Sequence, residues 1–248
     1  MSTSYRETLV ALRGAQKGAA RSAPAYSRFV NRRLGRYLAA WAYGRGLSPD
    51  AVTGLSGLAT FAGIALLALV APSWPLGIAV AALLVLGYAL DSADGQVARL
   101  TGKGSQAGEW LDHMVDALKI STLPIALGIG LYRFTTLDDA WLLVPLVHAI
   151  VGAVYFFGMI LTEQLRRAAG VQSQAATGGR APWLRSLLVL PTDYGVLCLV
   201  FVLLGAVDVF MVAYGLIVLC TVLVTVAASA KWYVELRGWR VEAPVGSS

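Results

Sequence analysis

Long apolar runs constrain the fold of this chain more than any other feature. A helix needs about 20 residues to cross a hydrocarbon core of roughly 30 Å. With their flanks, six runs are long enough, and they lie at residues 51–71, 75–90, 120–131, 141–161, 189–207 and 209–230. The second and third reach full length only by including residues 91–98 and 108–119, which carry charges. Two predicted spans therefore hold charged side chains within the helix.

Composition agrees with a membrane-embedded chain. Hydrophobic residues make up 57% of the sequence and charged residues 14%, whereas an average soluble domain carries about 25% charged residues. Cys198 and Cys220 both fall in apolar spans, so we interpret them as buried apolar side chains and not as a disulfide or metal pair. The first 24 residues have no apolar stretch, so they do not resemble a cleavable signal peptide.

The distribution of basic residues predicts the orientation. Lys and Arg favour cytoplasmic loops. Of the 20 basic residues, only Arg133 falls on the opposite side, and Lys119 lies within the third span. Both termini are therefore predicted to be cytoplasmic, and we expect the bacterial cytoplasmic membrane. The net charge of +6 indicates attraction to anionic lipid headgroups, and no soluble basic domain is present to bind nucleic acid.

The segment before the first span has the pattern of an amphipathic helix. Apolar residues recur at helical spacing from Tyr26 to Trp41, and Arg28, Arg32 and Arg36 take the other face. This pattern is typical of a helix lying in the membrane interface, although a helix packed on a soluble partner would also show it. The predicted fold is an all-α integral membrane protein with six transmembrane helices, preceded by this cytoplasmic interfacial helix. The predicted divisions are a flexible basic tail (1–24), the amphipathic helix (25–46), the six-span domain (47–232) and a C-terminal tail (233–248).

Four aspartates form the most distinctive pattern in the chain. Asp91 and Asp94 are three residues apart, and Asp112 and Asp116 are four apart. On helices, each pair shares a face. A short turn between the second and third spans would bring the two pairs together near the inner membrane surface. The alternative, a helix hairpin with solvated charges, accounts poorly for four acidic residues at these spacings.

Four carboxylates in or near lipid require compensation. Each costs roughly 2.5–3.5 kcal/mol at the centre of a span, and close carboxylates repel one another. Two divalent cations would balance their charge, and all-oxygen ligands suit Mg²⁺ or Mn²⁺ better than Zn²⁺. Paired cations can stabilise the attacking and leaving oxygens of a displacement at phosphorus. Gly95 and Gly108 would let a nucleotide approach the backbone, Ala98 keeps the same face small, and Arg99 is placed to meet a phosphate.

These residues resemble a known family signature. The run Asp-x-x-Asp-Gly-x-x-Ala-Arg, eight residues, then Gly-x-x-x-Asp-x-x-x-Asp, starting at Asp91 and ending at Asp116, is similar to that of the CDP-alcohol phosphotransferases. The expected spans and interfacial helix also resemble that family, so the similarity covers most of the chain.

The resemblance implies a role for each motif residue. Asp91, Asp94 and Asp112 would hold one cation, and Asp91, Asp112 and Asp116 the second. Asp116 would also be the general base that takes the proton of the acceptor hydroxyl. The CDP moiety would lie against Asp94, Gly95, Ala98, Arg99 and Gly108. Members of this family are usually homodimers, so the resemblance also implies a second copy as partner.

Acceptor-binding residues are less well defined by the sequence. Lys119 follows Asp116 by three residues, so it would either neutralise the acidic cluster or touch the acceptor. Arg180 and Arg185 could bind a phosphate on the acceptor. Asp193 could complete the acceptor pocket or cap a helix. His148, in the middle of a span, is expected to be a hydrogen-bonded structural group.

The predicted function is transfer of a phosphatidyl or other phosphoalcohol group in phospholipid biosynthesis. The favoured donor is CDP-diacylglycerol, because a lipid donor justifies a membrane site, and the acceptor would be an alcohol or alcohol phosphate. Transfer from a soluble CDP-alcohol is the alternative within the same chemistry. A divalent-cation transporter is the alternative from another class, but it would align acidic residues through the bilayer.

Overall fold

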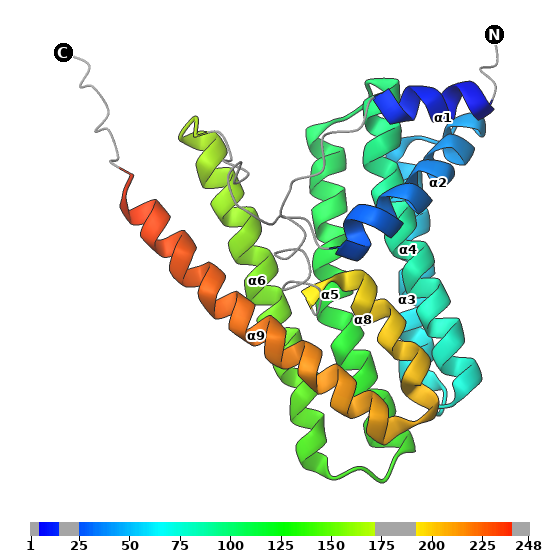
Figure 1. Cartoon of the computed structure of the whole chain (residues 1–248), viewed down its shortest axis with the longest axis vertical. Coiled ribbons are helices and arrows are strands. Elements are labelled where there is room, and N and C mark those ends of the chain that lie inside the picture. The colour runs from blue at the N-terminus through cyan, green and yellow to red at the C-terminus, as the bar shows by residue number, and fades with distance from the viewer. Residues whose placement is uncertain (1–4, 15–24, 172–191, 240–248) are drawn as a thin grey trace.

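Helices account for all regular secondary structure in the described part of the chain. The computed structural model describes residues 5–14, 25–171 and 192–239, and no strand occurs among them (Figure 1). In chain order the elements are α1 (Tyr5–Gly14), η1 (Ser27–Asn31), α2 (Arg32–Gly44), α3 (Pro49–Leu69), α4 (Trp74–Thr101), α5 (Gln106–Phe134), η2 (Asp139–Leu142), α6 (Leu143–Ala168), α8 (Tyr194–Val200), η4 (Phe201–Gly205) and α9 (Val207–Arg237). The all-α fold class is confirmed.

Five helical segments in the described residues have the length and apolar character of membrane spans. They are α3, α4, α5, the segment Asp139–Ala168 that joins η2 to α6, and α9. As predicted, α4 and α5 extend beyond their apolar runs and carry the aspartates on their adjoining ends. Helix α9 continues to Arg237, which is beyond the predicted domain boundary at residue 232.

The prediction of six full spans is not confirmed. The fifth predicted span, residues 189–207, begins outside the described residues, and its described part is the short apolar segment Tyr194–Gly205. The segment starts as α8, tightens into the 3₁₀ helix η4 and ends at Ala206, whose backbone leaves the helical region. At the rise of these helices, 194–205 covers roughly 20 Å, which is short of the hydrocarbon core.

The segment predicted as an interfacial helix is helical, as η1 followed by α2. Small residues of α2, such as Gly35 and Ala39, are buried, and α2 contacts α4. The large apolar side chains of Phe29 in η1 and of Tyr37 and Trp41 in α2 are exposed. This arrangement leaves an apolar face that is free to enter the boundary between lipid headgroups and acyl chains. The location of the helix at a membrane surface remains a prediction.

The predicted flexible tail does not hold for residues 5–14. These residues form α1, which contacts α2 and α4. Leu12 is buried in a cluster with Ala39 and Val97, and the Tyr5 hydroxyl donates to the Tyr37 carbonyl oxygen at 3.2 Å. Only a few apolar residues within a charged sequence provide this packing, so the pattern alone did not predict a helix.

Close backbone approaches hold α3 against α4 and α5. A side chain at Gly130 of α5 would lie 2.0 Å from the carbonyl oxygen of Leu67, and one at Gly87 of α4 would lie 2.1 Å from the Thr60 hydroxyl. A side chain at Gly130 would therefore displace the backbone of α3, and one at Gly87 would displace the Thr60 side chain. These contacts fix the relative positions of the three helices that carry the site.

Two predictions about single residues in spans are confirmed. Nδ1 of His148 lies 2.6 Å from the hydroxyl of Tyr214, so the histidine is a hydrogen-bonded group between α6 and α9. Cys198 is fully buried, as predicted, whereas Cys220 is only partly buried.

Candidate active site

A tight turn between α4 and α5 positions the four aspartates. Helix α4 ends at Gly102, whose φ of 65° places it in the left-handed region, the usual conformation of a glycine C-cap. Helix α5 begins after Ser105, whose hydroxyl accepts from the backbone N–H of Gly108 at 2.9 Å, as an N-cap does. The two caps reverse the chain direction, so the ends of α4 and α5 that carry the aspartates meet, while α3 packs against both helices.

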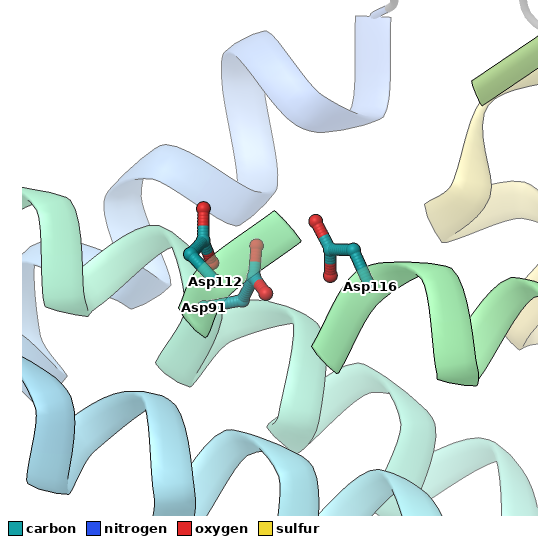
Figure 2. Close-up of side chains that lie close together, drawn as sticks. All are labelled: Asp91, Asp112 and Asp116. Carbon is teal, nitrogen blue, oxygen red and sulfur yellow. The ribbon is translucent and has the colours of Figure 1, made fainter. Parts of the chain in front are cut away.

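Three of the four aspartates form one cluster. Asp91 of α4 and Asp112 and Asp116 of α5 each offer a carboxylate oxygen, and these oxygens all lie within 4.8 Å of one another. Figure 2 shows the three side chains projecting into a shared space. All three are partly buried. The spacing of four residues places Asp112 and Asp116 on one face of α5, and the turn brings Asp91 opposite them.

The chemistry of this cluster fits a hard divalent cation. Three carboxylates converge at one point, and neither His nor Cys joins them in the described part of the chain. Mg²⁺ and Mn²⁺ prefer such oxygen ligands. Asp91, Asp112 and Asp116 are therefore the residues that could hold a cation here.

Asp94 is separate from the cluster of three. Its Oδ2 accepts from the Thr53 hydroxyl at 2.6 Å, and its side chain is nearly fully buried. Thr53 belongs to α3, so this contact joins the beginning of α3 to the end of α4. Asp94 still lines the two polar cavities next to the cluster, and its part in binding a cation stays a prediction.

Lys119 lies against the cluster and is buried at 5% exposure. Its Nζ donates to Asp91 Oδ1 at 2.7 Å, to Asp116 Oδ1 at 3.1 Å and to the Ser56 hydroxyl at 3.0 Å. The ammonium therefore pairs with the carboxylates, as the first of the two predicted roles requires, and contact with the acceptor stays a prediction.

A polar cavity of about 620 Å³ opens beside the aspartates. All five residues expected to bind the CDP moiety line it, namely Asp94, Gly95, Ala98, Arg99 and Gly108. A side chain added at Gly108 would lie 3.0 Å from Asp50 Oδ1, so the cavity wall leaves little room for a larger residue at this position. A smaller cavity of about 300 Å³ shares Asp94, Gly95, Arg99 and Asp112 with it and adds Arg32 and Asp91.

Several residues of these cavities were not assigned a role from the sequence. Asp50 and Thr53 come from the first turns of α3, and Lys103 from the turn between α4 and α5. Arg32 comes from α2. The proline after the Ser48 N-cap marks where α3 begins, but its distance from the motif could not be read from the sequence. Together Arg32, Arg99 and Lys103 give the cavities a basic side suited to a diphosphate.

A second kind of cavity, of about 680 Å³, lies between α5 and α6. Its wall is largely apolar and includes Trp110, Phe156 and Phe157. Gln106 and Glu109 line both this cavity and the polar one. An apolar space therefore adjoins the polar cavity at the beginning of α5.

The acceptor-binding role of Arg180, Arg185 and Asp193 stays a prediction. Arg180 and Arg185 lie outside the described residues. Asp193 is the N-cap of α8, where Oδ1 accepts from the Gly195 N–H and Oδ2 from the Ser27 N–H, each at 3.1 Å. Its carboxylate is thus engaged in holding η1 against α8.

The fold and the site define a class of polytopic membrane proteins in which carboxylates of two adjacent helices face a polar cavity. A family model for CDP-alcohol phosphatidyltransferase matches residues 47–228. The chain therefore belongs to this family, whose members are transferases of phosphate-containing groups and are generally dependent on divalent metals. A comparison with curated proteins gave no match.

Proposed function

We propose that this protein transfers the phosphatidyl group of CDP-diacylglycerol to the hydroxyl of an alcohol or alcohol phosphate and releases CMP. The single observation that carries the proposal is the convergence of Asp91, Asp112 and Asp116 beside a cavity lined by glycines and basic residues. Membership of the family supports the more general function, which is transfer of a phosphoalcohol from a CDP-linked donor in lipid synthesis.

In this proposal, some residues of the site bind the donor and another takes up the proton of the acceptor. Arg99 and Lys103 would pair with the diphosphate, while Gly95 and Gly108 leave room for the nucleotide. The acceptor oxygen would form a bond to the β-phosphorus of the donor, and the bond from that phosphorus to the oxygen bridging to CMP would break. Asp116 would take the acceptor proton, and CMP would leave with the bridging oxygen.

Two divalent cations, Mg²⁺ or Mn²⁺, belong to this proposal. When bound, they would stabilise negative charge on the attacking and leaving oxygens. Asp91, Asp112 and Asp116 would hold them, together with Asp94 if its carboxylate turns from Thr53.

The apolar cavity between α5 and α6 supports a lipid donor over a soluble CDP-alcohol. It adjoins the polar cavity through Gln106 and Glu109, so one amphiphilic molecule could occupy both. The proposal includes an active site open to the cytoplasmic leaflet and a homodimer. The exposed apolar side chains of α6, such as Ile150 and Val154, offer a face for lipid or for a second copy.

The test is CMP release by the purified protein in lipid nanodiscs. CDP-diacylglycerol and soluble CDP-alcohols would be supplied in parallel with a panel of alcohols and alcohol phosphates, with Mg²⁺, Mn²⁺ or a chelator. We expect release only with metal and with the lipid donor, and loss of release in Asp112→Ala. Full activity of that variant, or release in the chelator, would contradict the mechanism. Uptake of Mn²⁺ into proteoliposomes without CMP release would favour the transporter instead.

A further inference from the structure

The ammonium of Lys119 occupies a position that three helices build for it. Lys119 extends from α5, and its partners are Ser56 of α3, Asp91 of α4 and Asp116 of α5, at 2.7–3.1 Å. Its side chain is 6% exposed. A surface lysine moves among many conformations, but this one has all three of its N–H donors engaged.

Ser56 helps to hold the Lys119 ammonium in place. It is fully buried, and its hydroxyl donates to the carbonyl oxygen of Gly87 at 2.9 Å. With its proton directed to Gly87, the Ser56 oxygen presents a lone pair to Lys119. Gly87 is also a point of close approach between α3 and α4. The position of the ammonium is therefore fixed by the packing of the helices and not only by the carboxylates.

The residues that Lys119 contacts are the ones that could hold a cation. Asp91 and Asp116 belong to the carboxylate cluster, and no hydrogen bond or ion pair within 4 Å joins Lys119 to its third member, Asp112. A cation bound on the side of Asp91 and Asp116 would meet the charge of the ammonium at short range. At a few ångströms and in a partly buried site, repulsion between like charges is large.

We propose that Lys119 is an internal counter-cation of the carboxylate cluster and competes with a divalent cation for Asp91 and Asp116. This inference rests on the proposed metal-dependent function. Two divalent cations balance four aspartates, so with Lys119 present the two would leave one excess positive charge. The diphosphate of the donor carries the negative charge that offsets it. Lys119 thus makes the second cation bind together with the donor and holds the carboxylates in place before either arrives.

The experiment measures Mn²⁺ binding to the full chain in nanodiscs, with and without CDP, by titration calorimetry and Mn²⁺ electron paramagnetic resonance. In the unmodified protein we expect one Mn²⁺ to bind more tightly than the second, and CDP to tighten the second. Lys119→Met should tighten the second Mn²⁺ at least tenfold without CDP and remove most of the effect of CDP. Lys231→Met, which removes an exposed lysine of α9, is the matched control and should leave both affinities unchanged.

Melting temperatures provide an independent readout. Without metal, the melting temperature of Lys119→Met should be lower than that of the unmodified protein, because the carboxylates lose their counter-charge. Mn²⁺ should remove this difference in melting temperature. Ser56→Ala retains the ammonium but loosens it, so it should tighten the second Mn²⁺ by a few-fold. This milder variant serves as the test if Lys119→Met does not fold.

The outcomes separate the inference from the function on which it rests. Mn²⁺ affinities that are unchanged or weaker in Lys119→Met, or unchanged in Ser56→Ala if only that variant folds, would overturn the role of Lys119 while leaving the metal site intact. An unmodified protein that binds no Mn²⁺ with or without CDP would instead remove the metal-dependent function itself.

Discussion

The helices that carry the site and the helices beside them are packed very differently. Within the most apolar window of each helix, 44% of residues are buried in α3, 50% in α4 and 39% in α5, but only 17% in the segment containing α6 and 33% in α9. In Figure 1, α9 crosses α6, and both lean away from α5 towards the end where α4 and α5 join. The cavity between α5 and α6 lies in this opening.

Different interactions hold the two regions. The α3–α5 group has backbone approaches at Gly87 and Gly130 and a buried hydrogen bond from Thr53 to Asp94. At the end near the site, α6 is joined to α9 by two hydrogen bonds from Arg166 to Glu235, at 2.7 and 2.8 Å. Packed backbone tolerates little movement, whereas partly exposed ion pairs are weak. The comparison indicates a rigid half that fixes the chemistry and a looser half that leaves room for an amphiphile.

The largest effect is expected from the rigid half, at Asp116. Asp116→Asn retains the shape of the side chain but removes the proposed base, so kcat should fall by about 10²–10⁴-fold. CMP release measures this, with melting temperature as the check on folding. Asp208→Asn, at an exposed position in the first turn of α9, should retain full activity. A kcat of Asp116→Asn within twofold of the unmodified protein would exclude the assigned role.

A matched pair of glycines tests the packing difference directly. Gly130→Ala would place a methyl group against the backbone of α3, and such overpacking typically costs about 1–3 kcal/mol. Gly215→Ala in α9 meets nothing within 4 Å and removes a helix-interior glycine, so it should be neutral or stabilising by up to about 1 kcal/mol. Thermal unfolding in the same nanodiscs compares them. Equal losses at both positions would show that the two halves do not differ in packing.

The smallest effect is expected at the ion pair between α6 and α9. Glu235→Gln should reduce stability by only about 0.2–1 kcal/mol, the range of partly exposed pairs, and leave Mn²⁺ affinity unchanged. The control is Glu163→Gln, because Glu163 lies farther from Arg166, at 3.6 Å. A fall in melting temperature as large as that of Gly130→Ala would mean that the looser half depends on this contact far more than its exposure indicates.

Much of the site could be predicted because it follows from local spacing. The positions of Asp112 and Asp116 on one face of a helix, and the turn at Gly102, depend only on neighbouring residues. The five residues expected at the nucleotide come from a stretch of 15 positions, 94–108, and they do line one cavity. The helix α1 and the contact of Asp193 with the Ser27 N–H were missed because their partners are distant in the chain.

The sequence by itself determined that this chain is a helical membrane protein of the CDP-alcohol phosphatidyltransferase family, since apolar length and the motif are properties of short segments. Only the tertiary structure decided which aspartates meet, that Thr53 engages Asp94 and that Ser56 holds Lys119 against the cluster. It also decided that α6 opens away from α5. Those features depend on how α3 packs against α4 and α5, and the spacing of residues within one helix does not tell which residues of another helix they meet.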